Sequence, residues 1–144
     1  MTKRISILGS TGSIGQNALK VIEHLGDGFE VKYLSAARSS EVLIEQARKF
    51  QPATVALIDL SAAEEVKEAL SGSGVEVLSG REGLLELASR DDVDVVLNGL
   101  VGSAGMEPTI RALEAGVDVA LSNKESLVMA GELIENIKKE TGAE

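Results

Sequence analysis

Short apolar runs alternate with segments of helical periodicity along the 144 residues of the chain. Apolar runs of strand length predict strands, and apolar positions three or four residues apart predict amphipathic helices. The predicted strands are residues 5–8, 29–35, 54–58, 75–78, 93–97 and 117–121. The predicted helices are residues 14–25, 42–50, 62–70, 84–89, 108–115 and 126–139, with Gly142 placed to cap the last one.

This alternation predicts the fold class. Strands that alternate with helices of this length form βαβ units, and such units build a parallel sheet. The runs 5–8, 93–97 and 117–121 carry few polar residues, as expected for strands that helices cover on both faces. We therefore expect one α/β domain, residues 1–144, with a Rossmann-like doubly wound, mostly parallel sheet and helices on both faces.

Composition narrows the classes of function. Fourteen Lys and Arg against 23 Asp and Glu give a net charge of −9, which argues against binding nucleic acid or anionic membranes in general. The absence of cysteine excludes thiol nucleophiles and Cys-based metal sites, and a single histidine excludes a multi-histidine site. No apolar run approaches the roughly 18 residues of a membrane span, and the N-terminal segment lacks the apolar core of a signal peptide. A soluble cytoplasmic protein is therefore expected.

Residues 9–15, Gly-Ser-Thr-Gly-Ser-Ile-Gly, connect the first predicted strand to the first predicted helix. The spacing of Gly9, Gly12 and Gly15 is a variant of the dinucleotide-binding fingerprint. The glycines permit a sharp turn and let a pyrophosphate approach the backbone, while the helix N-terminus offers free N–H groups. Thr11 and Ser13 add hydroxyl donors. Because a strand precedes the turn and a helix follows it, we favour a dinucleotide site over a tight turn without a ligand.

The end of the second predicted strand indicates which dinucleotide is bound. NAD enzymes usually carry Asp or Glu here, about 20 residues beyond the glycines, to hold the ribose 2′-hydroxyl. This chain instead has Ala37, Arg38, Ser39 and Ser40. A guanidinium with hydroxyls beside it suits a 2′-phosphate, which favours NADP over NAD. In the alternative interpretation, Arg38 is a solvated charge and Ser39 or Ser40 caps the next helix; capping and binding are compatible.

A second glycine turn follows the predicted strand 93–97. Gly99, Gly102 and Gly105 repeat the spacing of the first turn. In a doubly wound sheet this strand lies beside the first one, at the switch point where ligands bind. These small residues either give the dinucleotide room or let turn and helix backbones pack closely, and the sequence leaves both interpretations open.

Polar residues also follow the predicted strand 117–121, namely Ser122, Asn123, Lys124 and Glu125. At the end of a strand they would point into the same crevice. Ser122 and Glu125 also match a capping box, which is a structural alternative. Lys124 fits that alternative less well, because a cation opposes the dipole at a helix N-terminus. Lys124 is therefore the candidate for contact with an anionic substrate.

The remaining polar residues of interest are expected to be structural. His24 is expected near the C-terminal end of the first helix, where the dipole favours it, and not as a catalytic base. The pairs Glu64-Glu65 and Asp91-Asp92 are expected on the solvated surface. No set of carboxylates is spaced to hold a metal.

Three motifs occur in a specific order: residues 9–15, residues 101–105 followed by Pro108-Thr109, and residues 123–128. In order and separation they resemble the 1-deoxy-D-xylulose 5-phosphate reductoisomerase family. The first motif is shared with many dehydrogenases, but the three together are specific. The resemblance runs over all 144 residues.

The resemblance implies a homodimeric enzyme of the non-mevalonate isoprenoid pathway. That enzyme rearranges 1-deoxy-D-xylulose 5-phosphate and reduces the product with NADPH to 2-C-methyl-D-erythritol 4-phosphate, aided by Mg²⁺ or Mn²⁺. By this likeness the pyrophosphate lies on the first turn, the 2′-phosphate on the loop after the second strand, and the substrate at Lys124. The cofactor-binding residues are then Gly9, Thr11, Gly12, Ser13, Ile14, Gly15, Ala37, Arg38, Ser39, Gly102, Asn123 and Glu125.

Two departures from the family pattern matter. The family usually has Gly-Lys-Asn or similar at positions 37–39, so Ala37 alters the backbone freedom while Arg38 keeps the cation. The family's metal site is an Asp-Ser-Glu motif with a further glutamate beyond the dinucleotide-binding domain, and no Asp-Ser-Glu occurs here. We therefore expect the N-terminal NADPH-binding domain of the enzyme, which binds NADPH but holds no metal and does not catalyse by itself.

Two other classes stay open. The chain could be a stand-alone NADP-binding sensor or regulator, for which a polar outer surface would be expected. It could also be a related NADP-dependent semialdehyde or homoserine dehydrogenase. An apolar face left bare for a further domain would favour the reductoisomerase domain over a sensor.

Overall fold

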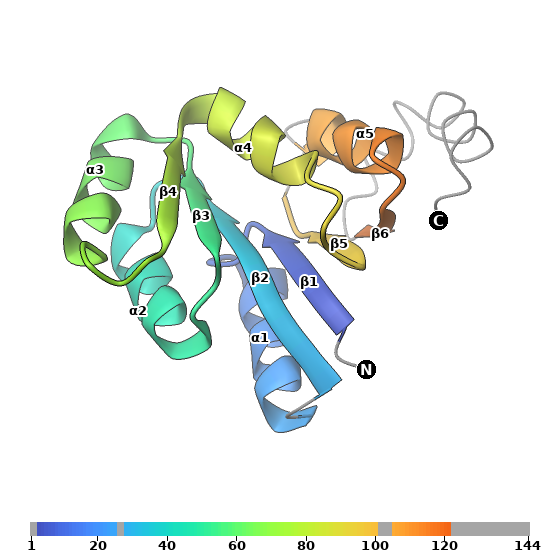
Figure 1. Ribbon diagram of the computed structural model, residues 1–144, viewed down its shortest axis with the longest axis horizontal. Coiled ribbons are helices and arrows are strands. Elements are labelled where there is room, and N and C mark those ends of the chain that lie inside the picture. The colour runs from blue at the N-terminus through green and yellow to red at the C-terminus, as the bar shows by residue number, and fades with distance from the viewer. Residues whose placement is uncertain (1–2, 26–27, 101–104, 122–144) are drawn as a thin grey trace.

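Six strands and five helices alternate along the part of the chain that the structure describes (Figure 1). The computed structural model describes residues 3–25, 28–100 and 105–121. The strands are β1 (Lys3–Leu8), β2 (Phe29–Ala36), β3 (Thr54–Leu57), β4 (Glu76–Ser79), β5 (Val95–Asn98) and β6 (Asp118–Leu121). The helices are α1 (Ser13–Leu25), α2 (Ser40–Phe50), α3 (Leu60–Ala69), α4 (Gly80–Ala88) and α5 (Met106–Glu114). Each of these elements corresponds to one predicted from the sequence pattern.

The six strands form one sheet in the order β4-β3-β2-β1-β5-β6. Every pairing between these strands is parallel. The chain builds one half of the sheet outward from β1, then returns to the other side of β1 with β5. The fold is therefore a doubly wound α/β fold of the Rossmann type, and the predicted position of β5 beside β1 is confirmed.

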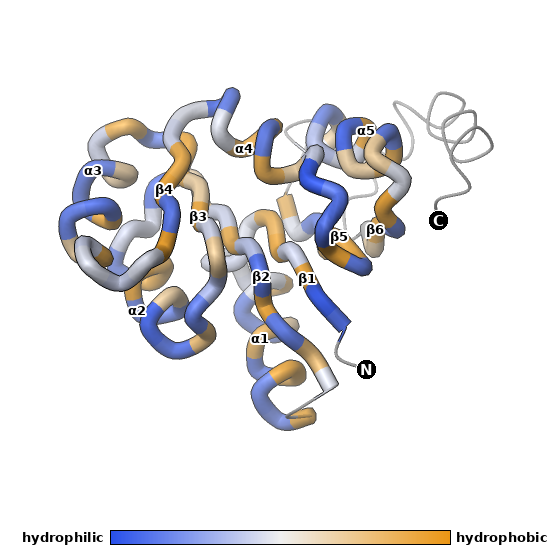
Figure 2. Tube along the Cα trace, in the orientation of Figure 1, coloured by the Kyte–Doolittle hydropathy of each residue, from blue (hydrophilic) through white to orange (hydrophobic). Residues whose placement is uncertain are grey.

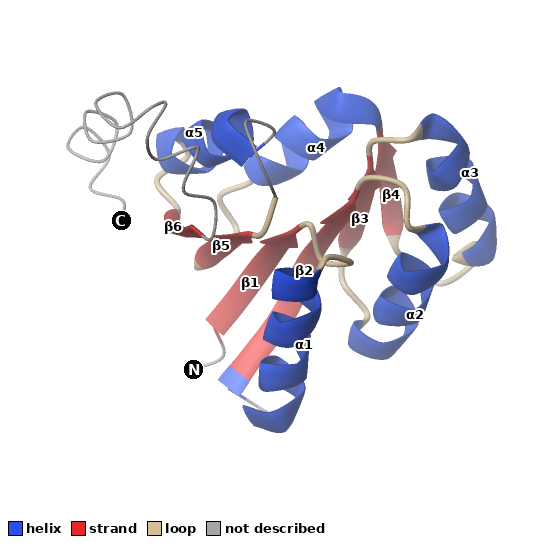
Figure 3. Ribbon diagram, turned by 180° about the vertical axis from the view of Figure 1, so that it is seen from behind, coloured by secondary structure: helices blue, strands red, loops and turns tan. Residues whose placement is uncertain are grey.

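Helices cover both faces of this sheet (Figure 3). Helices α1, α2 and α3 pack on one face, and α4 and α5 pack on the other. Side chains of β1 alternate between the two cores: Ile5 and Ile7 contact the first group of helices, whereas Leu8 belongs to the core under the second group. Hydrophilic residues gather on the helix turns that lie far from the sheet (Figure 2). Coverage on both faces explains the nearly continuous apolar runs in the central strands.

Most element boundaries differ from the predicted ones by one or two residues, and the start of α4 differs by four. Strand β5 begins at Val95 and not at position 93, because Asp94 engages the start of β1: its Oδ2 accepts from the Arg4 N–H at 2.7 Å. Helix α4 begins at Gly80 and not at position 84, because its first turn holds Arg81 and Glu82, good helix formers without an apolar pattern. The predicted helix 126–139 and its cap at Gly142 lie outside the described residues.

Candidate functional site

The two glycine turns lie against each other at the carboxyl ends of β1 and β5. The Gly99 N–H donates to the Leu8 carbonyl O at 2.9 Å. Gly9 has a φ of +75°, and a Cβ at this position would lie 3.2 Å from the carbonyl C of Gly99. A Cβ on Gly99 would in turn lie 3.2 Å from the Leu8 carbonyl O. Backbone packing between the turns therefore accounts for the glycines at both positions.

Gly12 and Gly15 are glycines for different reasons. A Cβ on Gly15 would lie 2.5 Å from Ser10 Cα and 2.8 Å from the Ser10 carbonyl C, so only glycine lets α1 begin this close to the turn. Among the described residues, a Cβ on Gly12 would meet only the Gly9 carbonyl O, at an ordinary contact distance of 3.6 Å, and Gly12 is exposed. Packing therefore does not require glycine at position 12. Its open side leaves room for a ligand to approach the backbone closely.

Hydrogen bonds from β2 and α2 hold the first half of this turn. The Gly9 N–H donates to Ser35 Oγ at 3.1 Å, and the Ser10 N–H donates to the Ser35 carbonyl O at 2.8 Å. Gln46 Nε2 donates to the Ser10 carbonyl O at 2.8 Å, and Gln46 Oε1 accepts from Ser10 Oγ at 2.8 Å. Ser10, Ser35 and Gln46 are all buried. The roles of Ser35 and Gln46 were not predicted from the sequence. The available signal was that each is a polar residue at a position where the hydrophobic pattern predicts burial.

The beginning of α1 has the groups needed to bind an anion. The Gly12 N–H donates to the Gly9 carbonyl O at 3.2 Å, and the Gln16 N–H donates to the Gly12 carbonyl O at 2.9 Å. Among the described residues, no acceptor pairs with the N–H groups of Thr11, Ser13 and Ile14. These donors lie at the positive end of the helix dipole, beside the open side of Gly12. The turn therefore fits the diphosphate of a dinucleotide in charge and in hydrogen bonding.

The loop after β2 presents a cation at the same edge of the sheet. Ala37, Arg38 and Ser39 are exposed, and they follow the strand that pairs with β1. Ser39 occupies the N-cap position of α2, but its side chain makes no capping hydrogen bond. Ser40 Oγ instead donates to Glu65 Oε2 of α3 at 2.9 Å. The interpretation that a serine side chain caps α2 is therefore wrong, because Ser39 forms no such bond and Ser40 bonds to another helix.

The carboxylate residue Asp59 lies close to this loop, and Glu41 follows the loop in the first turn of α2. The Asp59 N–H donates to the Ala37 carbonyl O at 2.9 Å, which holds the end of β3 against the end of β2. Asp59 Oδ1 accepts from the Ala62 N–H at 3.0 Å and caps α3. Its negative charge is therefore already directed at the positive end of a helix, while the Arg38 side chain is exposed in the loop.

Asn98 closes the second glycine turn from inside the protein. Its side chain is fully buried. Nδ2 donates to the Gly105 carbonyl O at 2.8 Å and to Thr109 Oγ1 at 2.6 Å, and Oδ1 accepts from the Leu100 N–H at 3.0 Å. These bonds tie the end of β5 to the beginning of α5. No role for Asn98 was predicted from the sequence, although an Asn at the end of an apolar run and before a glycine was an available signal.

A polar cluster lies away from the glycine turns, where β3, β4 and β5 begin. Tyr33 Oη donates to Asp92 Oδ1 at 2.7 Å, and Lys32 Nζ lies 3.0 Å from Asp92 Oδ2. Burial of the phenol, reinforced by its hydrogen bond to Asp92, raises the pKa of Tyr33. Burial alone would raise the pKa of Asp92, but hydrogen bonds from Tyr33 and Lys32 outweigh it and lower that pKa. Arg90 joins the cluster by donating to Thr54 Oγ1 at 2.9 Å. Asp92 therefore keeps a partly exposed side chain, as predicted for a surface carboxylate, and it also belongs to a hydrogen-bonded cluster, a role that was not predicted from the sequence.

The other residues expected to be structural lie where they were predicted. His24 is exposed in the last turn of α1. Glu64, Glu65 and Asp91 are exposed, and Glu65 also accepts the hydrogen bond from Ser40. None of them lies on the two glycine turns.

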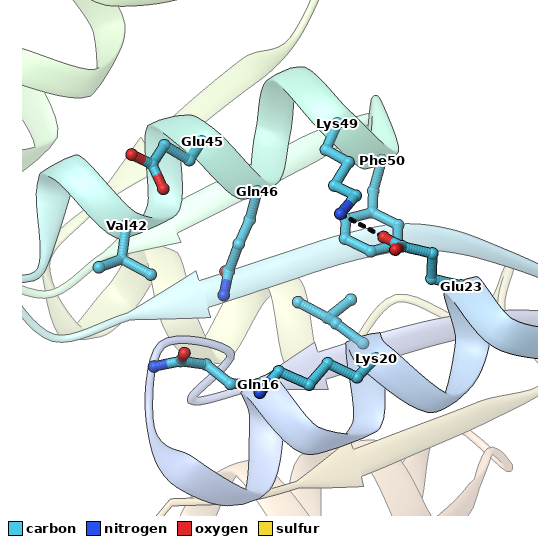
Figure 4. Close-up of a pocket in the computed structure, with 9 residues that line it drawn as sticks. Gln16, Lys20, Glu23, Val42, Glu45, Gln46, Lys49 and Phe50 are labelled. Atoms are coloured by element: carbon cyan, nitrogen blue, oxygen red, sulfur yellow. Dashed lines mark ion pairs between the residues drawn. The ribbon is translucent and has the colours of Figure 1, made fainter.

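A groove of about 410 Å³ opens between α1 and α2 (Figure 4). Leu19, Val42 and Phe50 provide its apolar surface, and an ion pair between Lys49 and Glu23 joins the two helices. The groove runs between two helices that cover one face of the sheet, whereas the glycine turns meet at the carboxyl ends of the strands. Gln46, which holds the first glycine turn, also lines this groove.

Four predicted site residues lie outside the described residues, namely Gly102, Asn123, Lys124 and Glu125. Within the described ranges, no group of three or more His, Cys, Asp or Glu side chains is placed to hold a metal ion. The helices of those same ranges include none with the length and apolar character needed to cross a membrane.

The strand order, the glycine turn at the start of α1 and the location of that turn at the switch point define an α/β domain of the Rossmann type, a class that binds nucleotides at this edge of the sheet. A sequence profile of 1-deoxy-D-xylulose 5-phosphate reductoisomerase matches residues 5–131. The chain therefore belongs to the 1-deoxy-D-xylulose 5-phosphate reductoisomerase family. This membership sets aside the alternative of a semialdehyde or homoserine dehydrogenase.

Relatives in this family match nearly the whole chain. The 1-deoxy-D-xylulose 5-phosphate reductoisomerase of Chloroherpeton thalassium is 47% identical over 140 residues, which are 97% of this chain and 36% of that protein. The structure of the enzyme from Zymomonas mobilis in complex with NADPH matches with a TM-score of 0.93 and 36% identity, over 99% of this chain and 38% of that one. A reductoisomerase structure with NADPH, fosmidomycin and magnesium matches with a TM-score of 0.92 and 34% identity, over 98% of this chain and 35% of that one. The chain thus spans little more than a third of the length of these relatives.

Proposed function

We propose that the chain, residues 1–144, is the NADPH-binding domain of a 1-deoxy-D-xylulose 5-phosphate reductoisomerase. The observation that carries this proposal is the first glycine turn. Its N–H groups at Thr11, Ser13 and Ile14 have no partner among the described residues, and they lie beside Gly12, where packing does not require a glycine. An anionic diphosphate satisfies these donors and uses the open side of the turn. The complexes of relatives with NADPH support the same cofactor here.

In this proposal each part of the cofactor has its own residues. The pyrophosphate binds to six residues of the first turn, namely Gly9, Thr11, Gly12, Ser13, Ile14 and Gly15. Arg38, with Ala37 and Ser39, binds the 2′-phosphate, because a guanidinium can donate two parallel hydrogen bonds to phosphate oxygens. Gly102, Asn123 and Glu125 complete the cofactor site, and Lys124 contacts the substrate.

The reaction of the whole enzyme is part of the same proposal. It isomerises 1-deoxy-D-xylulose 5-phosphate and reduces the product to 2-C-methyl-D-erythritol 4-phosphate, with NADPH as the hydride donor and Mg²⁺ or Mn²⁺ as the metal. The residues of this chain bind and orient the cofactor. We place the metal ligands beyond this domain, because the family's Asp-Ser-Glu motif does not occur in the sequence. We therefore expect this chain to bind NADPH without catalysing the reaction by itself.

The assembly and the location of the enzyme follow from the resemblance alone. We propose a homodimer in the cytoplasm for the whole enzyme. Sedimentation of the whole enzyme measures the first, and cell fractionation measures the second.

The test of cofactor binding is calorimetric titration of the chain with NADPH and, separately, with NADH. We expect NADPH to bind at least about tenfold more tightly, because the charge-assisted bonds to a 2′-phosphate are absent with NADH. Arg38→Asp should weaken NADPH binding about 10- to 100-fold and leave NADH binding nearly unchanged. The matched control is Arg48→Asp, which makes the same charge change in the last turn of α2, the helix that follows the Arg38 loop.

The control separates local recognition from overall charge. Both variants carry the same net charge, so a similar loss of NADPH affinity in both would contradict a specific role for Arg38. Equal affinity of the unaltered chain for NADPH and NADH would contradict the NADP assignment. Binding of neither dinucleotide by a folded chain would overturn the proposed function itself.

A further inference from the structure

We propose that Gln46 is a positioning residue of the cofactor site, which sets the orientation of the glycine turn that receives the pyrophosphate. This role rests on the proposed function. Gln46 belongs to α2 and lies 36 positions away from Ser10, the residue it contacts in the turn. Figure 4 shows its side chain extending from α2 toward α1. It is 8% exposed, so water has little access to its amide.

The amide of Gln46 makes two hydrogen bonds to one residue of the turn. Nε2 donates to the Ser10 carbonyl O at 2.8 Å, and Oε1 accepts from Ser10 Oγ at 2.8 Å. No other group in the described part of the chain donates to that carbonyl. Because Ser10 is fully buried, loss of the Nε2 donor would leave the carbonyl without a partner and without water to replace it.

The bond to the Ser10 carbonyl fixes a neighbouring donor. The peptide that links Ser10 to Thr11 is planar, and its C=O and N–H groups point in opposite directions. With the Ser10 carbonyl directed at Gln46, the Thr11 N–H is directed away from α2. That N–H is one of the donors with no partner among the described residues, at the start of α1. Rotation of this peptide would carry the donor away from the diphosphate, so Gln46 determines where it points.

A second glutamine shows the contrast. Gln16 Nε2 also donates to a carbonyl of the turn, that of Thr11, at 2.6 Å. Gln16 is exposed, so water can replace its bond when the side chain is removed. The same chemical group on the same turn is therefore dispensable at position 16 and required at position 46.

Two variants divide the contacts of Gln46. Gln46→Glu keeps an acceptor for Ser10 Oγ but loses the donor to the Ser10 carbonyl, whereas Ser10→Ala loses the hydroxyl bond and keeps the carbonyl bond. We expect Gln46→Glu to weaken NADPH binding about tenfold or more, and Ser10→Ala and Gln16→Met to change it less than about threefold. Gln46→Met, which removes the donor without adding charge, should match Gln46→Glu.

Titration with adenosine 2′-phosphate distinguishes positioning from general damage to the fold. This probe carries the 2′-phosphate but no pyrophosphate, so its affinity, measured by NMR titration, should stay within about twofold in all variants. Equal losses for NADPH and adenosine 2′-phosphate in both Gln46 variants, or unchanged NADPH affinity in both, would overturn the role of Gln46. A loss of NADPH affinity in Ser10→Ala as large as in Gln46→Glu would also overturn it. The hydroxyl bond between Ser10 and Gln46 would then matter as much as the carbonyl bond that orients the peptide. Failure of the unaltered chain to bind either ligand would instead overturn the proposed function, and this role with it.

Discussion

Replacing Gly15 and Gly12 by alanine, one at a time, separates close packing from ligand approach within one turn. At position 15 the added Cβ would lie 2.5 Å from Ser10 Cα, roughly 1 Å inside ordinary van der Waals contact. The atoms it meets are backbone atoms held by bonds to Ser35 and Gln46, so turn and helix must move apart. Overpacking of this kind costs about 3 kcal/mol, and the better helix propensity of alanine offsets about 1 kcal/mol. We expect a net loss of about 2 kcal/mol in the free energy of unfolding of Gly15→Ala.

At position 12 the same substitution should spare the fold and impair binding. In the described part of the chain, the atom nearest to the added Cβ is 3.6 Å away, so the free energy of unfolding should change by less than about 1 kcal/mol. The methyl group would occupy the open side of the turn and keep a diphosphate from the backbone. We expect NADPH affinity to fall about tenfold, which corresponds to about 1.4 kcal/mol.

Urea unfolding followed by circular dichroism measures the first effect, and calorimetric titration with NADPH measures the second. For a slope of about 2 kcal/mol per molar urea, Gly15→Ala should lower the midpoint by about 1 M, and Gly12→Ala should lower it by less than half as much. An unchanged midpoint in Gly15→Ala would refute the packing argument. Unchanged NADPH affinity in Gly12→Ala would refute the assignment of this glycine to ligand approach.

Three further predictions concern buried polar groups. Ser6 Oγ is buried and has no partner among the described residues, so Ser6→Ala should leave the urea midpoint unchanged or raise the free energy of unfolding by up to about 1 kcal/mol; a clear loss would contradict this. Asn98→Leu removes three hydrogen bonds made by a fully buried side chain and should lower the free energy of unfolding by about 2–3 kcal/mol, measured in the same way, whereas a neutral result would mean that Asn98 is not needed to hold the end of β5 to the start of α5. The raised pKa of Tyr33 means that the folded protein holds the phenol proton more tightly, so this contribution to stability is complete below about pH 10 and is lost as the pH rises through the raised pKa. Tyr33→Phe should therefore make the free energy of unfolding depend less steeply on pH in the alkaline range. An unchanged alkaline slope would contradict the raised pKa of Tyr33.

The element order could be predicted because its signals are local. The length of an apolar run and the spacing of apolar positions in a helix are contained within a few neighbouring residues. The start of β5 could not be predicted, because it depends on a bond from Arg4 to Asp94, which lie 90 positions apart. The bond from Tyr33 to Asp92 was missed for a similar reason, because the two residues lie 59 positions apart in the sequence.

The candidate site divides in the same way. The turn at residues 9–15 could be recognised because strand, glycines and helix are contiguous in the sequence. Ser35 and Gln46, which hold that turn, belong to other elements and lie 26 and 36 positions from their partners Gly9 and Ser10. The sequence around a single polar residue on the buried side of a helix does not show whether that residue holds another element in place or is only a buried polar side chain. The contacts of Gly9 with Gly99 likewise became visible only when β5 was seen beside β1.

The central place of β1 has a consequence for synthesis of the protein. β1 is the first of the described strands, yet it pairs on one side through Ile5 with Val31 and on the other side through Ile5 with Val95. After Val31 has been synthesised, a further 64 residues must be added before Val95 can pair with the second edge of β1. This takes about 3 to 13 s at ordinary translation rates of about 5–20 residues per second. During that time the nascent half-sheet from β1 to β4 exposes an apolar strand edge of the kind that pairs with other chains. Codon choice between β2 and β5 sets the length of this interval, so we expect it to affect how much of the protein escapes aggregation.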